Sequence, residues 1–133
     1  MKWIAFAVLV LVLAALAYIR LAPSDVARWH VLPDRISNQT LEGGAMRRVA
    51  GDLTALDAII RAAPRTSVLA GSVAQGMITY VTRSRVFGFP DYTTVRQVED
   101  GLEIYGRLRF GASDLGVNAA RIDGWLEALR QAG

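Results

Sequence analysis

The chain of 133 residues has no cysteine and one histidine, and each scarcity excludes a class of protein. A disulfide scaffold, a thiolate zinc site and a thiol nucleophile all require cysteine. With one histidine, only carboxylates remain for most metal or acid–base roles. The chain also lacks a Gly-rich phosphate loop, a Gly-x-Ser-x-Gly elbow and a His-Glu-x-x-His pair. We therefore expect no cofactor and no metal.

Lysine is also scarce, because 14 of the 15 basic residues are arginine. The formal net charge of +3 does not indicate a nucleic-acid protein, since residues 21–133 carry 13 basic and 12 acidic residues. No basic stripe interleaved with aromatic residues is present. We therefore expect no nucleic-acid partner.

Charge is absent from residues 3–19, WIAFAVLVLVLAALAYI, which Lys2 and Arg20 flank. At ~1.5 Å per residue this run covers roughly 26 Å, close to the thickness of a bilayer core. We predict that residues 1–22 form one transmembrane anchor. A signal peptide cleaved after Ala17 is the alternative, because Ala15-Leu16-Ala17 fits the small-x-small cleavage pattern. An early apolar segment followed by one small domain favours a bacterial inner-membrane protein, single-pass, with a periplasmic domain.

Residues 23–42 contain two prolines and no sustained periodicity, which predicts a juxtamembrane linker. The single histidine, His30, lies in this segment beside Trp29, and no catalytic partner for it stands at a recognisable spacing. We interpret it as an interfacial or solvated side chain.

Periodic patterns begin at Gly43, and we predict one domain over residues 43–133. A short strand near 45–50 precedes a helix that Asp52 caps and Pro64 ends. Apolar segments bounded by Gly, Pro or Asp follow, as is typical of antiparallel strands. A second helix begins near Asp114, with Leu115, Ile122, Leu126 and Leu129 facing a core. The order β-α-β-β-β-α predicts a two-layer α+β domain with a mostly antiparallel sheet.

The segments 92–98 and 102–110 predict a hairpin with Asp100-Gly101 as its turn. This register places Thr94 opposite Arg107 and Tyr92 opposite Arg109 on one face of the sheet. The other face carries apolar residues on which both helices can pack: Val95, Leu102, Ile104, Leu108 and Phe110.

Two similar segments, RSRVFGFPD from Arg83 and RLRFGASD from Arg107, each place Arg-x-Arg before Gly and Asp. If Arg83, Arg85, Arg107 and Arg109 share a face, they form a surface for a phosphate, a carboxylate or a lipid headgroup. The alternative is structural, because these arginines can instead pair with Asp91, Asp114 and Glu103 or keep one sheet face solvated.

The stretch RFGASDLGVNAARI resembles the carboxy-terminal pattern S-R-x-G-x-S-D-x-G-x-N-x-x-R of a bacterial family, the domain of unknown function 1499. The residues that match are Arg109, Gly111, Ser113, Asp114, Gly116, Asn118 and Arg121. The resemblance covers roughly residues 43–130 and implies an amino-terminal hydrophobic segment, but no activity. Many members have R-S-x-S-R where this chain has Tyr105-Gly106-Arg107-Leu108-Arg109, so both serines are missing.

At this strand-to-helix junction, Ser113 and Asp114 can cap backbone N–H groups, and Asn118 can bond back to the turn. The motif then acts as a structural clasp. The alternative is a ligand site at a helix N-terminus lined by Arg109 and Arg121.

These observations favour a membrane-anchored binding or interaction module for an anionic ligand, lipid headgroup or partner protein. A structural subunit of an inner-membrane assembly is the first alternative. The second is a small hydrolase that uses Asp91 or Asp114, although the sequence shows no nucleophile–base pair.

Overall fold

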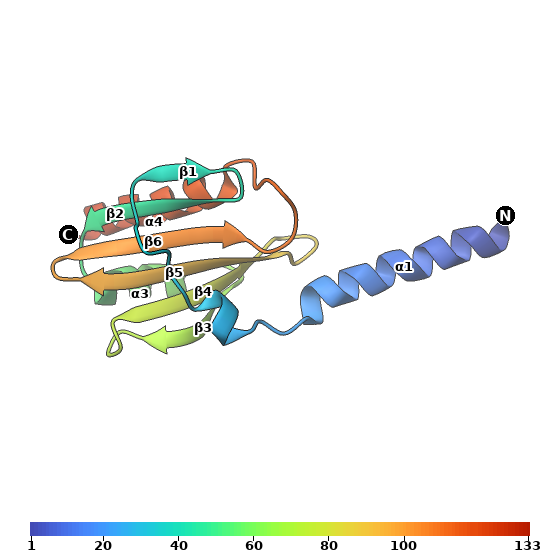
Figure 1. The fold of residues 1–133 in the computed structure, drawn as a ribbon, viewed down its shortest axis with the longest axis horizontal. Helices are drawn as coiled ribbons and strands as arrows, with labels where there is room; N and C mark the ends of the chain where they lie inside the picture. Colours follow the sequence, from blue (N-terminus) through green and yellow to red (C-terminus); the bar gives the residue numbers. More distant parts are fainter.

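A computed structural model describes residues 1–133 and contains one six-stranded sheet, two helices packed on it, and a separate amino-terminal helix (Figure 1). The helices are α1 (Lys2–Leu21), α2 (Val26–Trp29), α3 (Leu53–Arg61) and α4 (Val117–Ala132). The strands are β1 (Gln39–Leu41), β2 (Gly44–Ala50), β3 (Thr66–Ser72), β4 (Met77–Arg83), β5 (Pro90–Val98) and β6 (Gly101–Leu108). Their order across the sheet is β1-β2-β6-β5-β4-β3, with every neighbouring pair antiparallel.

The α+β class and the antiparallel sheet are confirmed, but the predicted order has too few strands. Two strands precede α3 instead of one, and four instead of three lie between α3 and α4. The additional strand before α3 is β1, which has only three residues, too few for a recognisable alternation.

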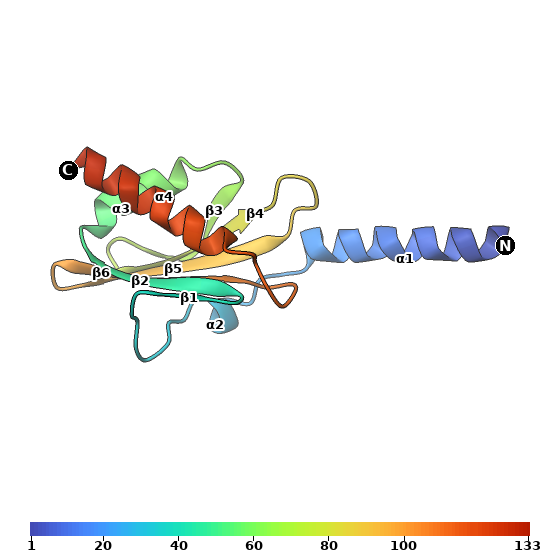
Figure 2. The ribbon, with the colours of Figure 1, turned by 90° about the horizontal axis from the view of Figure 1, so that it is seen from above.

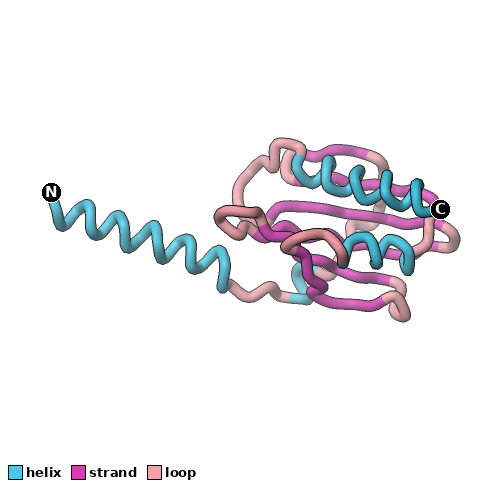
Figure 3. Tube along the Cα trace, turned by 180° about the vertical axis from the view of Figure 1, so that it is seen from behind, coloured by secondary structure: helices cyan, strands magenta, loops and turns pink.

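Helices α3 and α4 lie side by side on one face of the sheet, as the views from above and from behind show (Figure 2, Figure 3). The hydrophobic core lies between them and the sheet, as the apolar alternation predicts. Its fully buried members include Leu53, Leu56 and Ile60 of α3, Ile122 of α4, and Ile78, Tyr80, Val95, Leu102 and Ile104 of the strands.

The hairpin of β5 and β6 has a different turn from the predicted one. Val98 pairs with Gly101, so Glu99 and Asp100 form the turn, and Glu99 adopts a φ of 50°. Tyr92 therefore lies opposite Arg107, and Thr94 opposite Tyr105. Gly101 stays in the sheet because it also pairs with Ala50 of β2. Since the register differs by two residues, each side chain keeps its predicted face.

Part of the segment 23–42, predicted as a linker, packs against the second face of the sheet, and its residues Gln39–Leu41 form the edge strand β1. Asp25 caps α2 by accepting a hydrogen bond of 3.0 Å from the backbone N–H of Ala27. The indole of Trp29 is buried, and Figure 2 shows α2 on the opposite side of the sheet from α3 and α4. His30 is half-buried, and its Nδ1 lies 2.7 Å from Oγ1 of Thr79. Elements of three or four residues are too short to show periodicity.

The two packed helices begin differently from each other. Asp52 caps α3 as predicted, since it accepts a hydrogen bond of 3.3 Å from the backbone N–H of Ala55. Helix α4 begins at Val117 and not at Asp114, so Leu115 does not face the core. Leu115 is instead 92% exposed and has a φ of 54°.

Helix α1 extends away from the domain and buries none of its residues (Figure 1). It is long and apolar enough to cross a membrane. The loops that follow β4 and β6 lie at the end of the domain from which α1 leaves, and the β5–β6 turn lies at the opposite end (Figure 1, Figure 2).

Candidate functional site

The arginines predicted to form one open surface are separated in the structure. Arg107 belongs to β6 and Arg109 comes directly after it, on the face that α2 covers, and Arg83 ends β4 on the same face. Arg85 does not continue that alternation, because β4 ends at Arg83 and Arg85 lies exposed in the following loop. The backbone carbonyl groups of Pro23 and Trp29 accept hydrogen bonds from the guanidinium groups of Arg109 and Arg107, which the sequence alone did not indicate.

Arg109 is fastened to the chain that leaves α1. Its Nη1 donates hydrogen bonds of 3.1 Å to the carbonyl oxygen of Pro23 and to the hydroxyl of Tyr92. The bond with Tyr92 raises the pKa of Arg109 above its ordinary value. Ser24 reaches the same hydroxyl at 2.6 Å. Arg109 therefore holds the connection between α1 and the sheet.

Arg83 and Arg85 border an open pocket of about 600 Å³, which we call the arginine pocket. No hydrophobic or acidic side chain lines it. Its lining residues are Arg20, Arg65, Thr66, Ser67, Arg83, Ser84, Arg85 and Gly88. The four guanidinium groups make no ion pair, so nothing in the chain neutralises them.

Backbone carbonyl groups hold three of these four arginines in place. Arg20 donates a bond of 2.7 Å to the carbonyl oxygen of Val86, and Arg65 one of 3.0 Å to that of Arg83. Arg83 donates bonds of 2.9 Å to Gly88 and 3.3 Å to Ile19. Each guanidinium has five N–H donors, so each retains free ones. The side chain of Arg85 makes no hydrogen bond.

Sequence reasoning missed Arg20 and Arg65 as members of this pocket. The sequence marks Arg20 only as the polar end of the anchor, but its guanidinium also reaches the loop after β4. Arg65 precedes Thr66, which pairs with Thr82, so it lies beside Arg83. A register assigned to the β3–β4 hairpin would have placed these two arginines together.

The other predicted residues form a polar cluster on the face of the sheet that carries α4. The side-chain amide of Asn118 donates to Asp114 at 2.9 Å and to Asp91 at 3.3 Å. Arg121 donates to Asp91 at 3.2 Å. The backbone N–H groups of Gly116 and Asn118 complete the bonds to Asp114. Asp91, Asp114, Asn118 and Arg121 are therefore together, but on the opposite face from the sheet arginines.

The two carboxyl groups of this cluster titrate differently. Burial raises the pKa of Asp91 above its ordinary value, although Arg121 opposes the change. Burial also acts to raise the pKa of Asp114, but the hydrogen bonds from Asn118 and Gly116 outweigh it and lower that pKa. Every polar group of the cluster has a partner within the chain, which is the geometry of a clasp between β5 and the start of α4.

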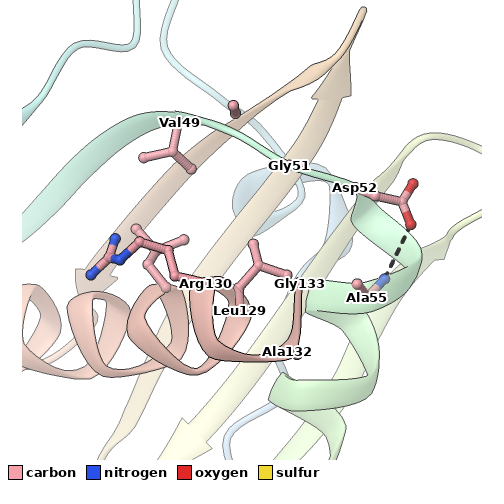
Figure 4. A pocket seen from close by; sticks show the side chains of 10 residues that line it. Val49, Gly51, Asp52, Ala55, Leu129, Arg130, Ala132 and Gly133 are labelled. Carbon is pink, nitrogen blue, oxygen red and sulfur yellow. Dashed lines mark hydrogen bonds between the residues drawn. The ribbon is translucent and has the colours of Figure 1, made fainter.

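A second cavity, of about 510 Å³, lies at the end of the domain far from α1, between β2 and the ends of α3 and α4 (Figure 4). Its walls are mostly apolar. The carboxyl group of Asp52 is used in capping α3, and Arg130 is paired with Glu127. No three His, Asp or Glu side chains in the chain gather closely enough to hold a metal ion.

The polar cluster and, except for Arg20, the residues of the arginine pocket lie within a region that matches a known family model. The family is described as protein of unknown function (DUF1499), and its model matches residues 23–129. The chain belongs to the DUF1499 family. The match begins directly after α1, so it includes α2, β1 and the Trp29 segment that the resemblance from residue 43 onward omitted. No curated protein matches the chain.

Proposed function

We propose that this DUF1499 protein is a single-pass membrane-anchored module that binds the anionic headgroup of a lipid in the arginine pocket. One observation carries the proposal. Four arginines without a carboxylate partner surround an open pocket, and one of them, Arg20, belongs to the last turn of the helix that can span a membrane. Guanidinium groups bind phosphate oxygens by paired hydrogen bonds, so a phospholipid headgroup is their natural complement.

The position of the pocket along α1 supports this ligand. Arg83 donates to the carbonyl oxygen of Ile19, so the pocket lies at the level of the final turn of α1. If α1 crosses the bilayer, its final turn lies among the headgroups. An arginine in the last turn can extend along the helix to reach phosphate groups.

Apolar side chains exposed on the two neighbouring loops also support contact with a bilayer. Val86 is 67% exposed and Phe87 49% exposed, both between β4 and β5, and Leu115 is exposed between β6 and α4. Both loops lie at the α1 end of the domain (Figure 2). Tyr18 of α1 contacts Phe110 with ring centroids 6.1 Å apart, and Phe110 in turn contacts Phe89 at 6.3 Å. This aromatic contact links α1 to both loops.

The membrane of this proposal is the inner membrane of a bacterium, with the α+β domain in the periplasm. The order of an early apolar segment and one small domain supports that arrangement.

The two alternatives from the sequence are a structural subunit of a membrane assembly and a carboxylate-dependent hydrolase. The partners that Asp91 and Asp114 already have within the chain favour neither carboxyl group as a free acid–base group.

The test uses the full chain in nanodiscs that contain phosphatidylglycerol and phosphatidylcholine. After the protein is released from the nanodisc, native mass spectrometry counts the lipid molecules that the protein retains. We expect the wild type to retain phosphatidylglycerol. The variant Arg65→Gln with Arg85→Gln should retain it about thirtyfold less, since each of the two arginines near phosphate contributes on the order of 1 kcal/mol.

The matched control is Arg35→Gln with Arg130→Gln, which removes the same charge from exposed residues that do not line the arginine pocket. Equal retention by the wild type and the pocket variant would contradict the proposal. Equal losses in the pocket and control variants would show a dependence on net charge instead of a site. A constant protein partner in mild detergent, with no retained lipid, would favour the structural subunit.

A further inference from the structure

Arg107 is a buried cation that no carboxylate neutralises. Its residue is 7% exposed and forms no ion pair. The guanidinium donates to the hydroxyl of Thr94 at 2.8 Å, to the carbonyl oxygen of Tyr105 at 3.1 Å and to the carbonyl oxygen of Trp29. Burial lowers the pKa of Arg107 to about 10. Because buried charges in proteins are normally paired, a missing counter-charge here points to a ligand.

Arg107 borders a cleft of about 440 Å³ between the sheet and the chain around α2, which we call the Trp29 cleft. A second arginine, Arg28, lines the same cleft, and its side chain makes no hydrogen bond or ion pair. Both guanidinium groups lie near the indole of Trp29, at 4.8 Å for Arg28 and 5.6 Å for Arg107 from the ring centroid. The Nε of Arg107 makes no hydrogen bond. No acidic residue lines the cleft.

Apart from Tyr105, the rest of the cleft is aliphatic or formed by glycine backbone. Val31, Leu41 and Leu108 supply aliphatic surface, and Gly43 and Gly44 leave open backbone. Cleft walls of this composition accept an apolar group at one end and a charged group at the other. A volume of this size is in the range of small-molecule sites.

We propose that the Trp29 cleft binds a small organic anion, whose carboxylate or phosphate group pairs with Arg107 and Arg28 and whose short apolar body packs against Val31, Leu41 and Leu108. The cleft shares no lining residue with the arginine pocket. Binding there is therefore independent of the lipid site, and one can fail while the other stands.

The test is ¹⁹F NMR of the full chain labelled with 5-fluorotryptophan in phosphatidylcholine nanodiscs. The three tryptophans report on different places: Trp29 on the cleft, Trp125 on the core, and Trp3 on the membrane. Hexanoate and hexyl phosphate are the probes, and they separate a carboxylate from a phosphate ligand. Hexanol is the uncharged control, and inorganic phosphate tests whether the apolar body is needed.

We expect a saturable shift of the Trp29 resonance with at least one of the two amphiphilic anions, and no such shift with hexanol. Arg28→Gln should weaken binding about tenfold, because it removes one charged donor. The side chain of Arg28 is exposed and forms no hydrogen bond or ion pair in the chain, so we expect this variant to keep the fold. Arg35→Gln is the matched control and should bind like the wild type.

The proposal is overturned by no saturable shift at Trp29, by equal affinity in the Arg28→Gln variant, or by equal binding of hexanol. A shift at Trp3 alone would also overturn it, since it shows partition of the probe into the bilayer. Arg107→Gln should abolish binding, provided that circular dichroism shows the wild-type fold for this variant. If Arg107→Gln does not fold, the affinity of the Arg28→Gln variant decides whether the proposal stands.

Discussion

The indole of Trp29 stacks on the phenol ring of Tyr92, with centroids 4.0 Å apart and planes inclined by 12°. This contact joins the segment after α1 to the middle of the sheet. Beside this stack, the carbonyl oxygen of Trp29 accepts two hydrogen bonds. One comes from the guanidinium group of Arg107, and the other, of 3.2 Å, comes from the hydroxyl of Thr94. Ring stacking and buried hydrogen bonds act on one residue, so Trp29 is the main attachment of this segment.

Replacing Trp29 with alanine should therefore destabilise the folded chain. Trp29 is 8% exposed, and truncating a buried large aromatic residue costs about 3 kcal/mol in free energy of unfolding. Urea unfolding of the full chain in micelles measures this loss. Trp3→Ala, at a residue 84% exposed, is the control. If both substitutions have the same small effect, Trp29 is not the attachment that we describe.

Asp91 and Asp114 should give opposite pH dependences of stability, although they share the amide of Asn118. The pKa of Asp114 is lowered in the folded state, so its carboxylate stabilises the fold above its ordinary pKa, and this contribution is lost as the pH falls. The pKa of Asp91 is raised, so its ionisation disfavours the fold as the pH rises past the ordinary value.

Unfolding free energies of the wild type, Asp91→Asn and Asp114→Asn between about pH 3 and about pH 7 test this pair. The advantage of the wild type over Asp114→Asn should grow with pH. Its advantage over Asp91→Asn should shrink with pH. Parallel pH profiles for the two variants would contradict the opposite shifts.

Two glycines should respond oppositely to alanine. A Cβ at Gly44 would lie 2.1 Å from the backbone oxygen of Gly106, where β2 meets β6, so Gly44→Ala should cost about 2 kcal/mol of unfolding free energy. Gly124 lies in α4 with open space around it, so Gly124→Ala should stabilise the fold by about 0.7 kcal/mol. Thermal unfolding compares them, and a tolerated Gly44→Ala would contradict the close approach.

The absence of native cysteine allows a direct test of which end of the domain meets the bilayer. A spin label on Val86→Cys or Leu115→Cys should be more accessible to oxygen than to a water-soluble nickel reagent. The same label on Glu99→Cys, in the turn at the opposite end, should show the reverse. Equal accessibility to the nickel reagent at all three positions would show that the two loops do not contact the bilayer.

The proposed topology can be measured with alkaline phosphatase fused after Gly133. We expect an active enzyme on a membrane-bound chain of full mass, because the anchor leaves the domain outside the cytoplasm. A soluble product that begins at Tyr18 would show cleavage after Ala17. An inactive fusion on intact chains would place the domain in the cytoplasm.

Local patterns in the sequence were sufficient for the features that depend on neighbouring residues. The uninterrupted apolar run of residues 3–19 determined α1, and alternation along 92–98 and 102–110 determined which face of the sheet is apolar. Asp52 was recognisable as a cap because a cap acts within one helical turn. The motif from Arg109 to Arg121 identified the family, which the match over residues 23–129 confirms.

Only the tertiary structure decided which distant residues meet. Arg20 and Arg65 join Arg83 across separations of 63 and 18 positions because α1 ends beside the β4–β5 loop and β3 pairs with β4. Arg107 became a buried cation because a segment without periodicity folds over β6 and places Trp29 on Tyr92. Such contacts depend on the register of the strands and on the path of short irregular segments, and neither leaves a periodic trace in the sequence.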